Sequence, residues 1–315
     1  FYYSRYESGK EYAIHCRKKD SLDGQEEILL DENILADGFN YFAIGGRRVS
    51  PDNKWLAYGV DTLSRRIYEV HFKNLETGEI LNKTIANSTG SVAWANDNQT
   101  VFYTSKNETT LLGEKIWRHK IGNETPDEMI YHVKDETYYN GVYRSKSGKF
   151  IIIYHSSTLI SDYQILNASN PNGKFSRFTP RDFDHEYSID HYNDKFYIIT
   201  NWKAKNNRLM ETSDNKTSLS NWKEAISHRQ DVHLIGMEIF NKHLVLSERK
   251  NGLRELRIIH QETGKDEYIN FAEEVYVSWI SINEDFDTNI LRYTYSSLVT
   301  PYSTFDYNME TGALD

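Results

Sequence analysis

The densest group of chemically versatile side chains lies between residues 182 and 191. Carboxylates and imidazoles in such a group can bind a metal ion or transfer protons. The group contains Asp182, Asp184, His185, Glu186, Asp190 and His191. Their spacing matches no diagnostic ligand motif. We therefore expect a solvated loop in which His191 leads into a strand, and no metal site.

Motifs that would place catalysis in this chain are absent from the sequence. A serine nucleophile on a tight strand-to-helix turn needs G-x-S-x-G, and none of the 17 glycines is followed two positions later by Ser. The sequence contains no C-x-x-C and no H-E-x-x-H, so zinc is not indicated. We predict no catalytic residue, no metal and no cofactor within the chain.

The charge balance restricts the partners of the protein. With 37 Lys and Arg against 46 Asp and Glu, the formal net charge is −9, which argues against a duplex DNA binder. Mean hydropathy is −0.69, and no apolar run is long enough to span a membrane. The single cysteine, Cys16, excludes an internal disulfide. We expect a cytoplasmic protein without nucleic-acid or membrane partners; any export signal would lie before Phe1.

A repeat along the chain predicts the elements that must position these residues. An apolar segment, a polar turn and a β-prone strand recur at Val49–Tyr58, Val92–Tyr103 and Val142–Ile153, and weaker copies follow. The turn residues are Asn53, Asp97, Gly148, Asp194, Asn241 and Asn283. Their spacing of roughly 42 to 51 residues is typical of four-stranded propeller blades.

Each repeat is followed by a second hairpin, and several of these carry the turn sequence Glu-Thr-Gly, ending at Gly78, Gly264 and Gly312. We therefore predict an all-β fold, with one propeller domain over residues 1–315. It would have seven four-stranded antiparallel blades, the first and last incomplete. The expected blades cover roughly 1–46, 47–90, 91–139, 140–186, 187–232, 233–275 and 276–315.

Several segments carry a family resemblance. Ile28–Gly38 followed by Val49–Gly59 resembles the first two blades of the prolyl oligopeptidase family. Asn201–Met210 followed by Asn221–Arg229 resembles the oligopeptidase B, or protease II, branch of that family. Ser296–Tyr307 is similar to the end of the family's propeller. The similarity covers essentially the whole chain in order.

This resemblance implies a propeller that caps an α/β-hydrolase domain and limits substrates to short peptides, which the oligopeptidase B branch cleaves after Arg and Lys. The implied partners are short basic peptides and the chain's own hydrolase domain. The Ser, Asp and His of the triad would lie in that domain, expected after Asp315, with a helical segment before Phe1. Residues 1–315 alone would then be inactive.

The resemblance also implies that a few propeller residues reach over the substrate pocket. The corresponding positions here are Thr89, Tyr139, Ser156 and Leu159. In prolyl-specific relatives this wall is more apolar and carries an Arg and a Cys, so the departure is compatible with a different specificity. The alternative is that these four residues belong to ordinary rim loops.

Two other functions stay open at this point. One is a free-standing propeller that binds a partner protein or peptide and never had a hydrolase domain; the incomplete first and last blades argue against it. The other is a glycan-binding propeller, which is supported only by the aromatic content of 14%. A G-x-S-x-G elbow encoded after Asp315 would favour the peptidase.

Overall fold

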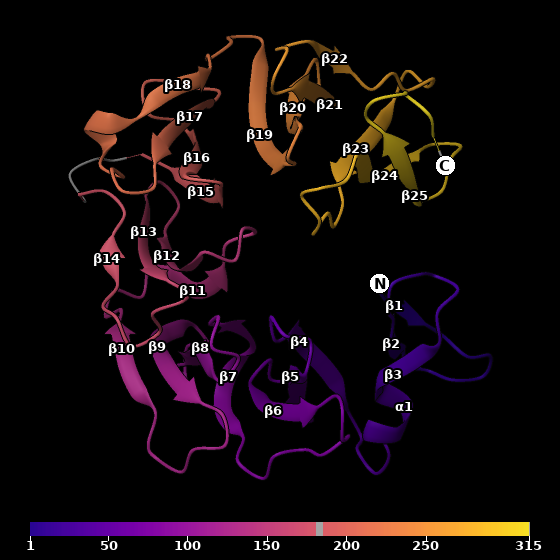
Figure 1. Cartoon of the computed structure of the whole chain (residues 1–315), viewed down its shortest axis with the longest axis vertical. Helices are drawn as coiled ribbons and strands as arrows, with labels where there is room; N and C mark the ends of the chain where they lie inside the picture. The colour runs from indigo at the N-terminus through magenta and orange to yellow at the C-terminus, as the bar shows by residue number, and fades with distance from the viewer. Residues whose placement is uncertain (181–184, 315) are drawn as a thin grey trace. The chain divides into compact units, whose positions relative to one another are not determined.

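The structure, a computed structural model, describes residues 1–180 and 185–314. In these ranges the chain forms 25 strands and two short helices, α1 (Glu32–Leu35) and a 3-10 turn (Leu219–Asn221) (Figure 1). The all-β prediction is therefore confirmed. None of the helices described there is long and apolar enough to cross a membrane.

The chain divides into two compact units. The first unit contains Phe1–Thr158 and Asp162–Phe178, and the second contains Leu159–Ser161 and Thr179–Asp315.

The first unit contains three antiparallel sheets, made of β1–β3, β4–β10 and β11–β14. Neighbouring strands in each sheet follow one another in the sequence, as expected for strands joined by hairpins. The strands are β1 (Tyr2–Arg5), β2 (Ile14–Lys18), β3 (Glu26–Asp31), β4 (Ala43–Val49), β5 (Trp55–Asp61), β6 (Tyr68–Asn74), β7 (Ile85–Trp94), β8 (Thr100–Lys106), β9 (Gly113–Lys120), β10 (Glu128–His132), β11 (Tyr139–Arg144), β12 (Phe150–Ser156), β13 (Ser161–Asn167) and β14 (Ser176–Arg177).

The second unit also contains three sheets, made of β15–β18, β19–β22 and β23–β25. Its strands are β15 (Tyr187–Tyr192), β16 (Lys195–Thr200), β17 (Arg208–Ser213), β18 (Lys223–Ile226), β19 (Val232–Ile239), β20 (His243–Lys250), β21 (Leu253–His260), β22 (Asp266–Tyr268), β23 (Tyr276–Ile280), β24 (Ile290–Ser297) and β25 (Ser303–Asn308).

The prediction of seven four-stranded blades is wrong. Over the described residues the strands form six sheets: three have four strands, two have three, and one has seven. The seven-stranded sheet arises because β7 crosses the boundary expected between residues 90 and 91. The first half of β7 pairs with β6 and its second half pairs with β8, and Ser88 is paired with both Tyr68 and Ser105. One continuous strand therefore joins two segments that the repeat separates.

The backbone of β7 changes direction where it changes partner. Asn87 and Gly90 have φ angles of 54° and 89°, in the left-handed region that glycine and asparagine tolerate best. The Ser88 hydroxyl donates to the Tyr68 carbonyl and accepts from the Gly90 amide, both at 3.0 Å. These bonds and the two positive φ angles let one strand leave β6 and join β8.

Three strands approach closely at this turn, and only glycines fit there. A Cβ on Gly59 of β5 would lie 2.5 Å from the Cα and the carbonyl oxygen of Gly90. A Cβ on Gly46 of β4 would lie 2.5 Å from the Cβ of Ser91. Side-chain atoms cannot be accommodated at such distances without moving the backbone.

Aromatic side chains pack between the strands of the same sheet. Trp94 is only 3% exposed; its Nε1 donates to the Arg48 carbonyl at 2.9 Å, and its ring meets Phe72 edge to face. Phe72 in turn stacks on His119, with the ring centroids 5.4 Å apart. The indole therefore buries a large apolar surface while its one polar atom keeps a partner.

A carboxylate joins β8 and β9 to the segment before β10. One oxygen of Asp127 lies 2.7 Å from Nδ1 of His119, and the other accepts from the Tyr103 hydroxyl at 2.8 Å. Burial acts to raise the pKa of Asp127, but the hydrogen bonds to His119 and Tyr103 outweigh it and hold this pKa below its ordinary value.

We expect Gly59→Ala to lower the free energy of unfolding by about 1–3 kcal/mol, because the new methyl group forces β5 and β7 apart. Urea denaturation measures the change. The matched control is Gly236→Ala in β19, where an added Cβ would come no nearer than 3.9 Å to another atom; we expect it to change the free energy by about 0.5 kcal/mol or less. Equal losses in the two variants would contradict the close approach at Gly90.

We expect Asp127→Asn to lower the free energy of unfolding at pH 7 by about 1–3 kcal/mol, because two hydrogen bonds lose their charged acceptor. The lowered folded-state pKa makes this contribution fully present above the unfolded pKa of about 4, and it is lost as the pH falls through the folded value. Urea titrations from neutral to acidic pH should therefore show the difference from the unsubstituted protein shrinking below about pH 4. Asp23→Asn, at an exposed position, is the control; a difference for Asp127→Asn that stays constant with pH would refute this linkage.

Candidate functional site

A hollow of about 230 Å³ opens in the first unit where β9 and β11 begin. We call it the rim hollow. It is formed by the β8–β9 turn and the β10–β11 connection, and its lining includes Leu112, Gly113, Glu114, Lys134, Asp135 and Asn140. A second hollow, of about 490 Å³, is lined by residues of β7, β8 and β9 and shares Glu114 with the first.

Asn140 holds the floor of the rim hollow in place. Its side-chain amide donates to the carbonyls of Gly113 and Tyr138 at 3.0 and 3.1 Å, and its Oδ1 lies 2.6 Å from Nδ1 of His155. One buried side chain therefore ties β9, β11 and β12 together. Gly113 has to be small here, because a Cβ would lie 2.8 Å from the methyl carbon of Thr104.

None of the four residues expected to face a substrate is among those that line this hollow. Thr89 lies in the turn of β7, and its methyl carbon is 3.8 Å from the point that a Cβ on Gly113 would occupy. Tyr139 and Ser156 are directly paired at the edge of the β11–β12 ladder, and Tyr139 is 65% exposed. Leu159 lies between β12 and β13, is 70% exposed and groups with the second unit. The strand pairing thus brings Tyr139 and Ser156 together, and Thr89 lies near Gly113.

Acidic side chains predominate in the lining of the rim hollow. Glu114, Asp135 and Glu136 line it together with one lysine, Lys134. The Lys115 ammonium, 2.9 Å from Glu114, holds the pKa of that carboxyl below its ordinary value, and a hydrogen bond from Asn107 adds to the effect. Three carboxylates against one lysine give the lining a net negative charge, which the ion pair between Glu114 and Lys115 reduces.

The acidic and histidine-rich segment at 182–191 differs from the solvated loop that we expected. Asp182 and Asp184 lie outside the described residues. His185 and His191 are buried, with exposed fractions of 6% and 0%. His191 is part of β15, as expected, and its ring contacts Phe196. The two imidazoles therefore contribute to the interior of the second unit.

The motif search missed one group of side chains with metal-ligand chemistry. His243, His260 and Glu310, all in the second unit, place one donor atom each within 4.8 Å of one another. They lie on β20, on β21 and after β25, so no short motif contains them. A signal was nevertheless present: the Asn251-Gly252 turn, which favours a tight hairpin, pairs His243 with His260.

Small antiparallel sheets of sequential strands are typical of β-propeller domains. The chain belongs to the family described as "Prolyl oligopeptidase, N-terminal beta-propeller domain", which matches residues 1–315. The family resemblance read from the sequence is thereby confirmed.

Two curated relatives are similar to nearly the whole of this chain. Dipeptidyl aminopeptidase BI of Pseudoxanthomonas mexicana is 37% identical over 99% of this chain and 45% of its own length. Protease 2 of Moraxella lacunata is 31% identical over 99% of this chain and 46% of its own length. The chain therefore spans about half the length of the curated relatives it matches.

Solved structures agree with the family. Oligopeptidase B from Leishmania major matches with a TM-score of 0.92 at 22% identity, over 100% of this chain and 46% of that chain. Oligopeptidase B from Trypanosoma brucei, in a closed form with covalently bound antipain, matches with a TM-score of 0.89 at 27% identity, over the same shares. The first likeness concerns the fold alone.

Proposed function

We propose that this chain is the propeller of a serine peptidase that cleaves short peptides after Arg and Lys, and that it limits substrate size and controls access to the active site. The observation that carries the proposal is the family match over residues 1–315. The 31% identity to Protease 2 and the 27% identity to an oligopeptidase B with bound antipain support the specificity.

In this proposal the chain docks on an α/β-hydrolase domain that supplies the Ser, Asp and His of the triad. A propeller docked over such a domain excludes folded proteins by geometry, so selectivity for short peptides requires no contact energy. Access then depends on opening at the connections between the two domains.

The charge of the rim hollow supports basic peptides as substrates. Three carboxylates and one lysine line it, and the chain as a whole carries a formal net charge of −9. A field of this sign raises the local concentration of cationic peptides and speeds their approach. Thr89, Tyr139, Ser156 and Leu159 would be further propeller residues that contact the peptide.

A second candidate differs in where the peptide is cut. The 37% identity to dipeptidyl aminopeptidase BI, over 99% of the chain, favours removal of dipeptides from a free amino terminus. The two candidates share the fold and the triad chemistry, and they differ in whether a blocked amino terminus is accepted.

The test uses the native polypeptide that contains residues 1–315. We expect a serine-reactive fluorophosphonate to label it and to abolish cleavage of a short Arg-amide peptide with a blocked amino terminus. Cleavage restricted to peptides with a free amino terminus, two residues at a time, would replace the first candidate by the second. Absence of both labelling and cleavage would refute a peptidase and favour a binding propeller.

We expect the double variant Glu108→Lys with Glu136→Lys to lower kcat/KM for an Arg-containing peptide by about two- to tenfold at low salt. The reason is that exposed Glu136 lines the rim hollow and exposed Glu108 lines the second hollow, so both carboxylates attract a cationic peptide. The effect should vanish near 1 M salt, where the Debye length is about 3 Å. The control is Glu79→Lys with Glu124→Lys, which makes the same change of net charge at exposed loop positions. An equal loss in the control, or no loss at low salt, would exclude a role for the rim carboxylates.

A further inference from the structure

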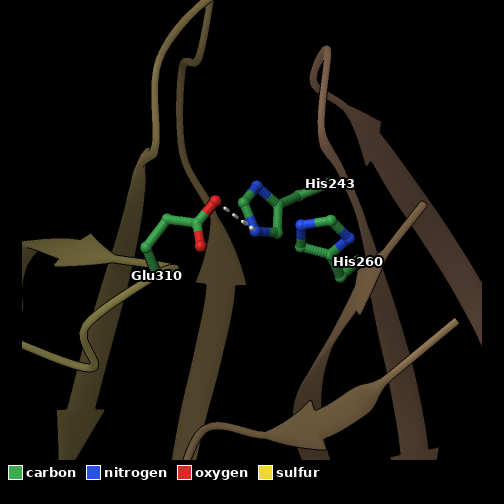
Figure 2. Close-up of side chains that lie close together, drawn as sticks. All are labelled: His243, His260 and Glu310. Carbon is green, nitrogen blue, oxygen red and sulfur yellow. Dashed lines mark ion pairs between the residues drawn. The ribbon is translucent and has the colours of Figure 1, made fainter. Parts of the chain in front are cut away.

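Three side chains of the second unit converge at one end of the β20–β21 hairpin. Figure 2 shows the rings of His243 and His260 side by side, with the carboxylate of Glu310 directed toward His243. Oε1 of Glu310 lies 3.6 Å from Nε2 of His243, and the three donor atoms all lie within 4.8 Å of one another. The group combines two imidazoles and one carboxylate.

The fold places these side chains together for definite reasons. His243 and His260 are directly opposite in the β20–β21 ladder, so their side chains emerge on the same face of the hairpin. Glu310 follows Met309, which is 5% exposed and packs in the same core cluster as Phe240 and Val245. The buried methionine therefore holds the turn after β25 against this hairpin.

His243 is buried, and its ring nitrogens have few hydrogen-bond partners. The residue is 1% exposed, and Nδ1 has no hydrogen-bond partner within the described parts of the chain. Nε2 is 3.6 Å from Glu310, beyond hydrogen-bond distance. A buried imidazole nitrogen without a hydrogen-bond partner can present its lone pair to a metal ion.

His260 and Glu310 give the group access to solvent. His260 is partly buried and Glu310 is exposed. Nδ1 of His260 accepts only a long hydrogen bond of 3.4 Å from the Thr263 amide. Coordination of a metal ion through Nε2 would move the ring proton to Nδ1 and give up this weak bond. Both side chains are therefore able to adjust, whereas His243 is fixed by the core.

We propose that His243, His260 and Glu310 form a binding site for a divalent transition-metal ion, with Zn²⁺ as the best match. Two imidazoles and one carboxylate are a ligand set that zinc accepts in tetrahedral sites, with water or another group in the fourth position. Donors bound to one tetrahedral zinc lie about 3.3 Å apart, given metal–ligand distances of about 2.0 Å. The observed spacing requires only a small inward movement of His260 and Glu310.

A metal ion here would join the hairpin β20–β21 to the turn after β25. The last sheet, β23–β25, has only three strands, and the turn that carries Glu310 contributes no strand to it. Binding to the folded form alone stabilises a protein in proportion to the logarithm of ligand concentration. The site would therefore act as a staple for the end of the second unit. This inference is independent of the proposed peptidase activity.

The experiment is a calorimetric titration of the chelator-treated native polypeptide with ZnCl₂, combined with thermal unfolding in Zn²⁺ and in EDTA. We expect His260→Gln and Glu310→Gln each to weaken zinc binding at this site at least about tenfold. The zinc-dependent rise in Tm should disappear in both variants, while their Tm in EDTA stays that of the unsubstituted protein. Cobalt(II) should give the visible absorption of a tetrahedral site in the unsubstituted protein only.

The controls are His233→Gln and Glu262→Gln, which alter the same residue types at exposed positions of the same unit. They should bind zinc as the unsubstituted protein does. Zinc affinity and zinc-dependent Tm that are unchanged in His260→Gln and Glu310→Gln would overturn the proposal, as would binding of Ca²⁺ in preference to Zn²⁺. Because the readouts are binding and unfolding, a failed peptidase assay leaves this result unaffected.

Discussion

The close backbone approach of β5 and β7 at Gly59 and Gly90 is the constraint on which the first unit depends. Because neither position carries a side chain, β7 can lie close to β5 and still pair with β6 on one side and β8 on the other. Backbone groups buried in a sheet must find such partners, because an unpaired one costs about as much as a lost hydrogen bond. The positive φ of Gly90 then turns the strand from β6 to β8.

The same turn brings Thr89 close to a residue that lines the rim hollow. Thr89 is carried between Ser88 and Gly90 and is thereby brought near Gly113, at the start of β9. Gly113 offers its carbonyl to Asn140, whose amide also fixes β11. The lining of the rim hollow is therefore held by backbone turns and one buried amide, and such rigid supports are what a binding surface requires.

The sequence predicted the local structure better than the assembly of the sheets. Alternating residues and recurring turns identified the strands, because each signal lies within a few residues. The repeat did not predict that β4–β10 form one sheet. The chain turns at Asn87 to Gly90 while it stays within the single strand β7, so no loop marks the change of partner. The resemblance named Thr89, Tyr139, Ser156 and Leu159, but none of them lines the rim hollow, and their role at a substrate stays a prediction.

The cluster of His243, His260 and Glu310 shows that sequence patterns also miss ligands brought together from distant segments. Motif searches find ligands that share one helix or one loop, because the spacing is then fixed by local geometry. In a β protein, donors on neighbouring strands are instead matched by register, and a hairpin pairs residues equidistant from its turn. The Asn251-Gly252 turn made the histidine pair accessible to sequence reasoning, but Glu310 was not, since its approach depends on the packing of Met309 in the core. Searches for metal ligands in such folds therefore have to follow strand pairing and core contacts as well as sequence spacing.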